Sequence, residues 1–209
     1  MLRVVVGGKQ IGYYSAFIVD RGDFMIFILQ TNTKLNIGDV VRVADNFASY
    51  EFVVVANRRE FIYYCTPRVV TDLKQVIFNK SFKENNSLKA IIDSVGSKLY
   101  RVVNDFEVLN FTFTGDGSQF LGFCRTQYGL SYYIDKETVL LYMKLEELEK
   151  LKHSVTVFGN NLIDINLSVR SLNFINDKRI SKVVHYASKG YSQVMFAQQN
   201  ICFNRRQCV

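Results

Sequence analysis

Proline, histidine and paired cysteines are scarce in this chain of 209 residues, and each scarcity counts against some structures or functions. Pro67 is the only proline and no low-complexity stretch is present, so any two domains should be closely packed or interleaved. His153 and His185 lack cysteine or carboxylate neighbours at the spacing of metal ligands. The four cysteines form no CxxC pair, which favours free or buried thiols in a reducing compartment. We therefore expect no metal site and no cofactor.

Long apolar runs are absent as well. The apolar run within residues 1–8 is too short for a signal peptide and is interrupted by glycines. Residues 24–29 form the longest apolar run nearby, far below the ~20 residues that span a bilayer. These features predict a soluble chain without membrane anchoring, made in a cytoplasm.

Apolar residues are nevertheless abundant. They make up 48% of the chain, and 14% is aromatic, so a sizeable core can be buried and gross disorder is not expected. The net charge of +7 permits binding to a polyanion without requiring it. The basic residues are scattered rather than concentrated in a stripe, and adjacent pairs occur only at 58–59, 178–179 and 205–206.

Both ends of the chain have the pattern of antiparallel strands. Apolar segments recur about every ten residues between Gly, Asn and Asp turns, which is typical of a small barrel or sandwich. Gly7 and Gly8 are expected to form a tight hairpin turn after the first strand. The expected strands are residues 3–6, 24–29 (buried on both faces), 40–43, 51–55, 60–65, 155–157, 162–167, 182–186 and 192–196.

The middle of the chain combines helices with strands. Ser118 is predicted to cap a helix, and Gly129 is predicted to end it in the left-handed conformation. An earlier helix should follow Ser87 and close at Gly96, and a strand is expected over residues 108–113. The two helices have apolar stripes at helical spacing: Leu88, Ile91, Ile92 and Val95, then Phe120, Leu121, Cys124 and Tyr128.

These patterns predict a β-rich α+β fold, an antiparallel β-barrel with a small α+β domain inserted into it. Residues 1–80 with 153–209 are expected to form the barrel, and residues 81–152 the inserted domain. Residues 145–152 are a charged amphipathic segment, which we interpret as a helical connector on the surface.

No catalytic arrangement stands out. Gly7-Gly8-Lys9 lacks the spacing of a phosphate-binding loop, and a strand rather than a helix should follow it. The sequence around Ser118 is not G-x-S-x-G, and His185 within an apolar run is more typical of a packed residue. An enzyme is not expected. If the chain were one, for example a hydrolase, His153 and His185 would be its best candidates.

Tyrosine pairs leave a second hypothesis open. Tyr13-Tyr14, Tyr63-Tyr64 and Tyr132-Tyr133 each place one ring on either face of a strand. With a basic surface, such strands could stack nucleobases, so a nucleic-acid-binding module is the alternative function. The core-strand consensus of an RNA-recognition motif is missing, and aromatic strand pairs are common at protein interfaces. We prefer the interface interpretation.

Several short patterns occur in a recognisable order. Residues 6–9 (VGGK), residues 35–41 (LNIGDVV) and the 87–95 helix precede the helix and hairpin of residues 115–143. This order resembles the tail hub proteins of contractile-tailed bacteriophages, relatives of the N-terminal part of type VI secretion spike proteins. The matching positions in the second half are Gly117, Ser118, Phe120-Leu121, Tyr128-Gly129-Leu130, residues 132–135 and residues 139–142.

The resemblance implies a structural, non-enzymatic role in the virion. It implies a tail-tube-like barrel with an inserted domain, and a homo-oligomeric ring, a trimer, within the tail or baseplate. The expected partners are tail tube or distal tail proteins together with central spike and baseplate proteins, assembled in the host cytoplasm. The family offers no catalytic residues to carry over. DNA would pass through the lumen of the ring, and Arg58 and Arg59 are the candidates to face it.

Overall fold

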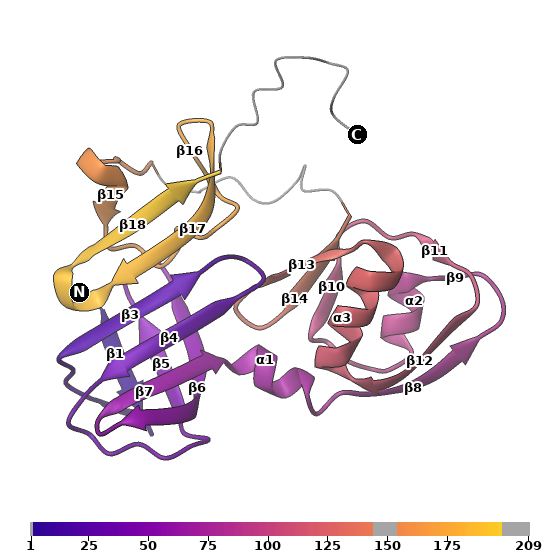
Figure 1. Ribbon diagram of the computed structural model, residues 1–209, viewed down its shortest axis with the longest axis horizontal. Coiled ribbons are helices and arrows are strands. Elements are labelled where there is room, and N and C mark those ends of the chain that lie inside the picture. Colours follow the sequence, from indigo (N-terminus) through magenta and orange to yellow (C-terminus); the bar gives the residue numbers. More distant parts are fainter. Residues whose placement is uncertain (1, 144–153, 198–209) are drawn as a thin grey trace.

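A computed structural model describes residues 2–143 and 154–197 of the protein. Figure 1 shows a curled antiparallel sheet at one end of the long axis and a smaller assembly of helices and short strands at the other. The middle segment, residues 68–142, supplies that smaller assembly, whereas the sheet takes its strands from both sides of it. Among the described residues, no helix has the length and apolar character needed to cross a membrane.

The large sheet, which we call the barrel sheet, curls without closing. Its strand order is β15-β18-β17-β3-β4-β7-β6-β5-β1-β2, and β16 pairs with β17 off this path. Strands β2 and β15 therefore lie at its two ends. The strands are β1 (Arg3–Val6), β2 (Lys9–Gln10), β3 (Ser15–Asp20), β4 (Met25–Gln30), β5 (Val40–Ala44), β6 (Ser49–Arg59), β7 (Ile62–Pro67), β15 (Leu162–Asp164), β16 (Phe174–Ile175), β17 (Lys178–Tyr186) and β18 (Tyr191–Phe196).

Local sequence explains the turns and faces of this sheet. The predicted hairpin at Gly7 and Gly8 is confirmed, since both have positive φ and Val6 pairs with Lys9 across them. Strand β4 alternates between buried and half-buried residues instead of being buried on both faces. That part of the prediction is wrong because only the concave face of a curled sheet lies against its core.

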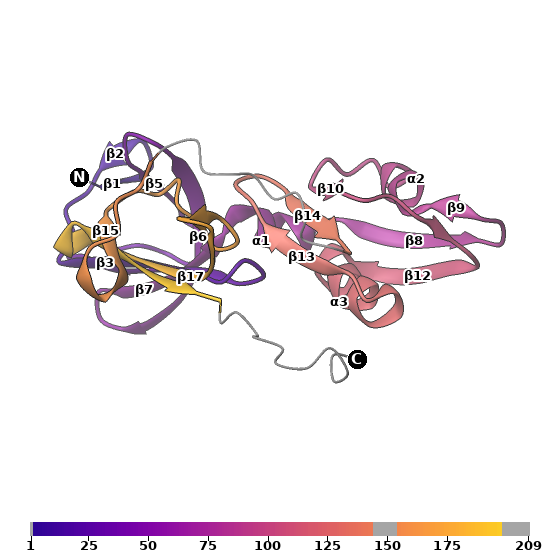
Figure 2. The ribbon, with the colours of Figure 1, turned by 90° about the horizontal axis from the view of Figure 1, so that it is seen from above.

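A loop closes the open side of the barrel sheet. Figure 2 shows the chain around β15 lying opposite β5 and β6. Leu167, fully buried in the core of the sheet, donates its backbone N–H to the carboxylate of Asp45 at 2.6 Å. Its carbonyl accepts from the hydroxyl of Tyr50 at 3.0 Å. These contacts join the loop to the β5–β6 hairpin, and strands β2 and β15 remain the ends of the sheet.

The middle segment has its own apolar core. Helices α2 and α3 lie against short sheets, in which β8 pairs with β12, β9 with β11, and β14 with both β10 and β13. Phe78 of β8 stacks on Phe120 of α3, with ring centroids 4.2 Å apart. The elements are α1 (Arg68–Leu73), β8 (Ile77–Phe82), β9 (Asn86–Ser87), α2 (Leu88–Asp93), β10 (Tyr100–Val102), β11 (Glu107–Val108), β12 (Phe111–Asp116), α3 (Gly117–Tyr128), β13 (Ser131–Ile134) and β14 (Val139–Tyr142).

The ends of the helices test the capping predictions. Gly129 ends α3 with φ of 65°, and the Ser87 side chain caps α2, as predicted. Ser118 does not cap α3, however, because the preceding Asp116 takes that position. The Asp116 carboxylate accepts from the backbone N–H of Ser118 and Gln119, and the Gln119 side chain accepts from the N–H of Asp116.

Two other expectations differ from the structure. The strand expected over 108–113 is split into β11 and β12, since Asn110 has a positive φ of 53°. Residues 155–157 form no strand. Strand β8 begins at Ile77, within residues 1–80, and pairs with β12 of the middle segment. The helical connector expected over 145–152 lies outside the described residues.

Candidate functional site

Arg170 occupies the junction between the barrel sheet and the middle segment. The side chain is 6% exposed and comes from the loop that closes the barrel. Its Nε donates to the carboxylate of Asp20, at the end of β3, over 2.5 Å. One terminal nitrogen donates to the carbonyl of Ile134 in β13 at 2.7 Å, and the other to the hydroxyl of Tyr50 at 3.1 Å. One guanidinium therefore joins three distant parts of the chain.

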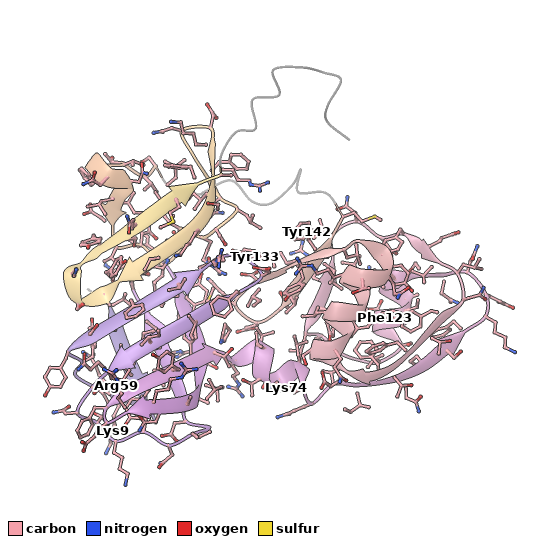
Figure 3. The ribbon with its side chains drawn as sticks, viewed as in Figure 1. Lys9, Arg59, Lys74, Phe123, Tyr133 and Tyr142 are labelled. Atoms are coloured by element: carbon pink, nitrogen blue, oxygen red, sulfur yellow. The ribbon has the colours of Figure 1, made fainter. Side chains whose placement is uncertain are left out.

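Two aromatic rings enclose this guanidinium. Tyr50 of β6 and Tyr133 of β13 both lie with their ring centroids 5.0 Å from the central carbon of Arg170. Figure 3 places Tyr133 between the barrel sheet and the middle segment. Cation–π contacts strengthen when water is excluded, and both rings are buried here. The arrangement suits a guanidinium, which is planar and stacks on rings in a way that an ammonium does not.

Asp20 is fully buried, and both of its carboxylate oxygens are occupied. One accepts from the backbone N–H of Gly22 and the hydroxyl of Ser171, the other from Arg170 and the backbone N–H of Ser171. Burial acts to raise the pKa of this carboxyl. The charge of Arg170 and these hydrogen bonds lower the pKa by more than burial raises it, so it lies below its ordinary value. The buried pair is thus ionised, and both carboxylate oxygens of Asp20 accept hydrogen bonds.

The same junction includes a direct contact between backbones. The N–H of Ile134 donates to the carbonyl of Gly22 in the turn between β3 and β4 at 2.8 Å. Gly22 has a φ of 90°, and an added Cβ there would meet Tyr133 at 3.3 Å. Arg170 and this turn together hold the β13–β14 hairpin against the barrel sheet. The arrangement fixes an orientation, and it offers no reactive group to solvent.

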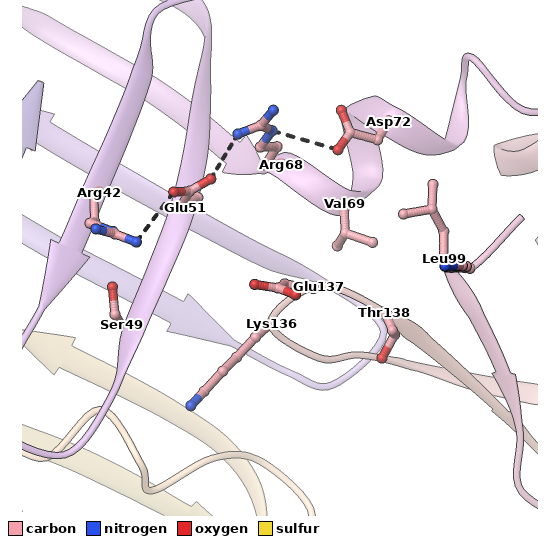
Figure 4. Close-up of a pocket in the computed structure, with 11 residues that line it drawn as sticks. Arg42, Ser49, Glu51, Arg68, Val69, Asp72, Leu99, Lys136, Glu137 and Thr138 are labelled. Carbon is pink, nitrogen blue, oxygen red and sulfur yellow. Dashed lines mark hydrogen bonds and ion pairs between the residues drawn. The ribbon is translucent and has the colours of Figure 1, made fainter. Parts of the chain in front are cut away.

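A groove of about 440 Å³ runs along one side of the junction. Arg42 and Arg68 both pair with Glu51, at 3.7 and 2.9 Å, and Arg68 also pairs with Asp72 at 3.6 Å. Figure 4 shows these four side chains in a row along the edge of the groove. Glu51 raises the pKa of Arg68, chiefly through their hydrogen bond. Such exposed pairs contribute little stability, so this row shapes a surface more than it strengthens the fold.

A smaller hollow of about 190 Å³ lies at the β3–β4 turn. The turn contributes Arg21 and Asp23, helix α3 contributes Arg125, and β13 and β14 contribute Tyr132 and Tyr142. Like the junction, this hollow is lined by residues of both the barrel sheet and the middle segment.

Arg58 and Arg59, the residues singled out in the sequence, lie at the end of β6. Both are exposed, and the hairpin that follows carries Phe61 with a φ of 64°. The guanidinium of Arg58 lies 5.3 Å from the ring centroid of Tyr64. Figure 3 labels Arg59 on the part of the barrel sheet away from the middle segment. Neither arginine belongs to the junction or its two hollows.

His185, the one histidine that the structure describes, is a packed residue. His185 is buried in β17, and its Nδ1 forms a hydrogen bond of 2.7 Å with the hydroxyl of Ser192. Burial chiefly lowers the pKa of His185 to about 4. His153 lies outside the described residues. Within residues 2–143 and 154–197, no group of three His, Cys, Asp or Glu side chains could hold a metal ion.

The tyrosine pairs do not form a row of exposed rings. Tyr63 and Tyr133 are buried, and the hydroxyl of Tyr63 accepts from the backbone N–H of Leu35. Tyr64 lies beneath Arg58, whereas Tyr14 is 68% exposed. These rings serve mainly in packing, which does not favour the base-stacking alternative.

Comparison with known proteins gives fold likenesses without sequence matches. No protein-family model matches the chain, and no curated protein matches it. Similar solved structures include a tail protein from Neisseria meningitidis MC58, with a TM-score of 0.48 and 11% identity over 67% of this chain and 49% of that one. The prophage tail protein gp18 from Listeria monocytogenes EGD-e has a TM-score of 0.49 and 10% identity over 77% and 55%. The 43 kDa tail protein of prophage MuSo2 from Shewanella oneidensis has a TM-score of 0.44 and 11% identity over 88% and 80%. The chain spans about half the length of the first two proteins.

Proposed function

We propose that the chain is a structural component of a phage tail, a hub or baseplate subunit that joins the tail tube to the central spike. The observation that carries this proposal is the open barrel sheet, whose strand order ends at β2 and β15. An edge strand offers backbone N–H and C=O groups that can pair with another chain. Subunits built around such edges can pair into a ring.

The register of β2 shows which groups the edge offers. The backbone N–H of Ile11 donates to Val4, and Val6 pairs with Lys9 across the hairpin turn. Hydrogen-bonded and non-hydrogen-bonded pairs alternate in antiparallel strands, so the intervening pair of Val5 and Gln10 is not hydrogen-bonded. The backbone N–H and carbonyl of Gln10 therefore point to the open edge. Strand β2 is short, as edges of soluble proteins commonly are.

The junction supports a role that depends on shape. A buried, ring-enclosed Arg170 with three hydrogen-bonded partners holds the middle segment at one angle to the barrel sheet. We propose that the middle segment is a domain inserted into the barrel. Its own core gathers residues from Val69 to Leu141, so the insertion begins nearer Arg68 than residue 81. A subunit of this kind can hold two neighbouring proteins in a fixed orientation relative to each other.

The proposed assembly follows from the same reasoning. The chain forms a homo-oligomeric ring, a trimer, and contacts tail tube or distal tail proteins, the central spike and baseplate proteins. DNA passes through the lumen, and Arg58 and Arg59 face it, since both are exposed at a hairpin of the barrel sheet. The role is structural and requires no catalysis or cofactor.

Light scattering of the full chain tests the proposal. The purified protein is measured alone and after mixing with purified tail tube and spike proteins. We expect a closed oligomer with three times the 24.1 kDa mass of one chain, alone or in the mixture. A protein that stays monomeric in both settings at high concentration contradicts the proposal.

A further inference from the structure

The hollow at the β3–β4 turn gathers positive charge that the described residues leave unpaired. Arg21 and Arg125 line it from the barrel sheet and from α3. Within the described residues, neither has a hydrogen bond or an ion pair with another side chain. This differs from the larger groove at the junction, where Arg42 and Arg68 both form ion pairs with Glu51.

A third arginine adds to this charge. The Nε of Arg179, at the start of β17, is buried and has no hydrogen-bond partner among the described residues. Its charge acts on Tyr142, which lines the hollow. Arg179 does not line the hollow itself, so it contributes through its charge rather than through a direct contact. Among the described residues, Asp23 is the only acidic side chain in the lining.

Hydroxyl donors complete the lining. Ser131 and Tyr132 come from β13, and Tyr142 lies opposite Ser131 in the strand pairing. Burial is the main cause that raises the pKa of both tyrosines, so their hydroxyls stay protonated at neutral pH and can donate. Leu172 and the tyrosine rings offer apolar surface beside these donors. The hollow thus combines arginine forks, hydroxyl donors and a small apolar wall.

We propose that this hollow binds a carboxylate, supplied by an acidic side chain of a neighbouring polypeptide. Planar arginine forks match carboxylates in a bidentate manner, and the apolar wall suits the methylene groups of a glutamate. A volume of about 190 Å³ admits one such side chain rather than a large ligand. The neighbouring polypeptide as source rests on the proposed tail function, whereas the affinity of the hollow for a carboxylate does not.

The test is a titration of the full chain followed by NMR of the arginine Nε–H groups. The probes are a blocked pentapeptide with two glutamates, the same peptide with two glutamines, and inorganic phosphate. We expect saturable shifts at Arg21 and Arg125 with the glutamate peptide only. Arg21→Gln and Arg125→Gln should each weaken that binding about tenfold. Arg101→Gln, an exposed arginine of the same middle segment, is the matched control and should leave it unchanged.

Each contrary result is decisive. The inference fails if the glutamate peptide gives no saturable shift, if the glutamine peptide binds equally well, or if Arg101→Gln weakens binding as much as Arg125→Gln. Tighter binding of phosphate than of the glutamate peptide overturns the carboxylate assignment. Since Arg21 and Arg125 are both exposed, either variant should fold, and Ser131→Ala gives a third, charge-neutral probe of the hollow. If the chain binds the peptide but never assembles, the inference about the hollow holds and the proposed tail function is rejected.

Discussion

Asp20 and Arg170 are 150 residues apart in the sequence and meet as a fully buried ion pair of 2.5 Å. The carboxylate belongs to a strand of the barrel sheet and the guanidinium to the loop that closes it. Through Arg170 the pair also reaches the carbonyl of Ile134 in the middle segment. The junction is therefore the part of the molecule where a single side chain affects both assemblies.

Removal of the Arg170 guanidinium should be strongly destabilising. Arg170→Met keeps most of the apolar stem but leaves the charge of Asp20 buried without its partner. We expect a loss of about 3–5 kcal/mol in the free energy of unfolding, measured by urea denaturation. Arg101→Met, at an exposed position, should change it by less than about 0.5 kcal/mol. A double variant with Asp20→Asn should recover part of the loss, and equal stability of Arg170→Met and the wild type would contradict this account.

His185 should make stability depend on pH. Burial lowers its pKa to about 4 in the folded chain. Of the smaller effects, Asp20 raises the pKa and Arg170 lowers it. The unfolded chain, with a histidine pKa near ~6.5, binds the proton more tightly, so stability is lost as pH falls from about 6.5 toward 4. We expect a loss of about 2 kcal/mol between pH 7 and pH 5. Urea denaturation at both values should show it in the wild type, and His185→Gln should remove most of the difference.

Gly117 should not tolerate a methyl group. A Cβ at this first residue of α3 would lie 2.6 Å from the carbonyl oxygen of Leu73, and the Gly117 carbonyl accepts from the hydroxyl of Tyr100 at 2.8 Å. We expect Gly117→Ala to cost about 2 kcal/mol in thermal or chemical unfolding. Gly122→Ala, in the same helix with nothing within 4 Å of its Cβ, should instead stabilise by about 0.5–1 kcal/mol. Equal effects of the two substitutions would refute this reading of the close approach.

The cap of α3 can be assigned by a pair of alanine variants. Asp116→Ala removes the acceptor for two backbone N–H groups, so it should lower the melting temperature by several degrees. Ser118→Ala removes only a hydroxyl that donates to Asp116, so its effect should be smaller. Circular dichroism melts measure both. A larger effect of Ser118→Ala would restore Ser118 as the cap.

Local features could be predicted from the sequence because local physics determines them. The hairpin at Gly7 and Gly8, the cap at Ser87 and the left-handed end at Gly129 follow from residue type and position. The choice between Asp116 and Ser118 was missed because both residues can cap a helix, and pairing of β12 with β8 up to Asp116 places the helix start one residue later.

The junction could not be predicted from the sequence. Asp20 and Arg170 lie in unremarkable turn-like contexts, and no spacing rule joins residues that far apart. Tyr50 and Tyr133 carry no pattern that would distinguish a ring over a guanidinium from a ring in a core. The tertiary fold alone brings them together. The one available signal was an arginine shortly after the apolar strand expected over residues 162–167, and it is a weak one.

The most direct test of the central claim concerns the open edge at β2. Gln10→Pro removes one outward backbone N–H and no hydrogen bond of the β1–β2 hairpin, whereas Gln10→Ala keeps that N–H. Sedimentation velocity of both variants, with and without the tail tube and spike proteins, measures assembly. We predict that Gln10→Ala assembles like the wild type and that Gln10→Pro shifts toward monomer while its melting temperature is unchanged. Undiminished assembly of Gln10→Pro would contradict the claim that this strand edge pairs with a neighbour.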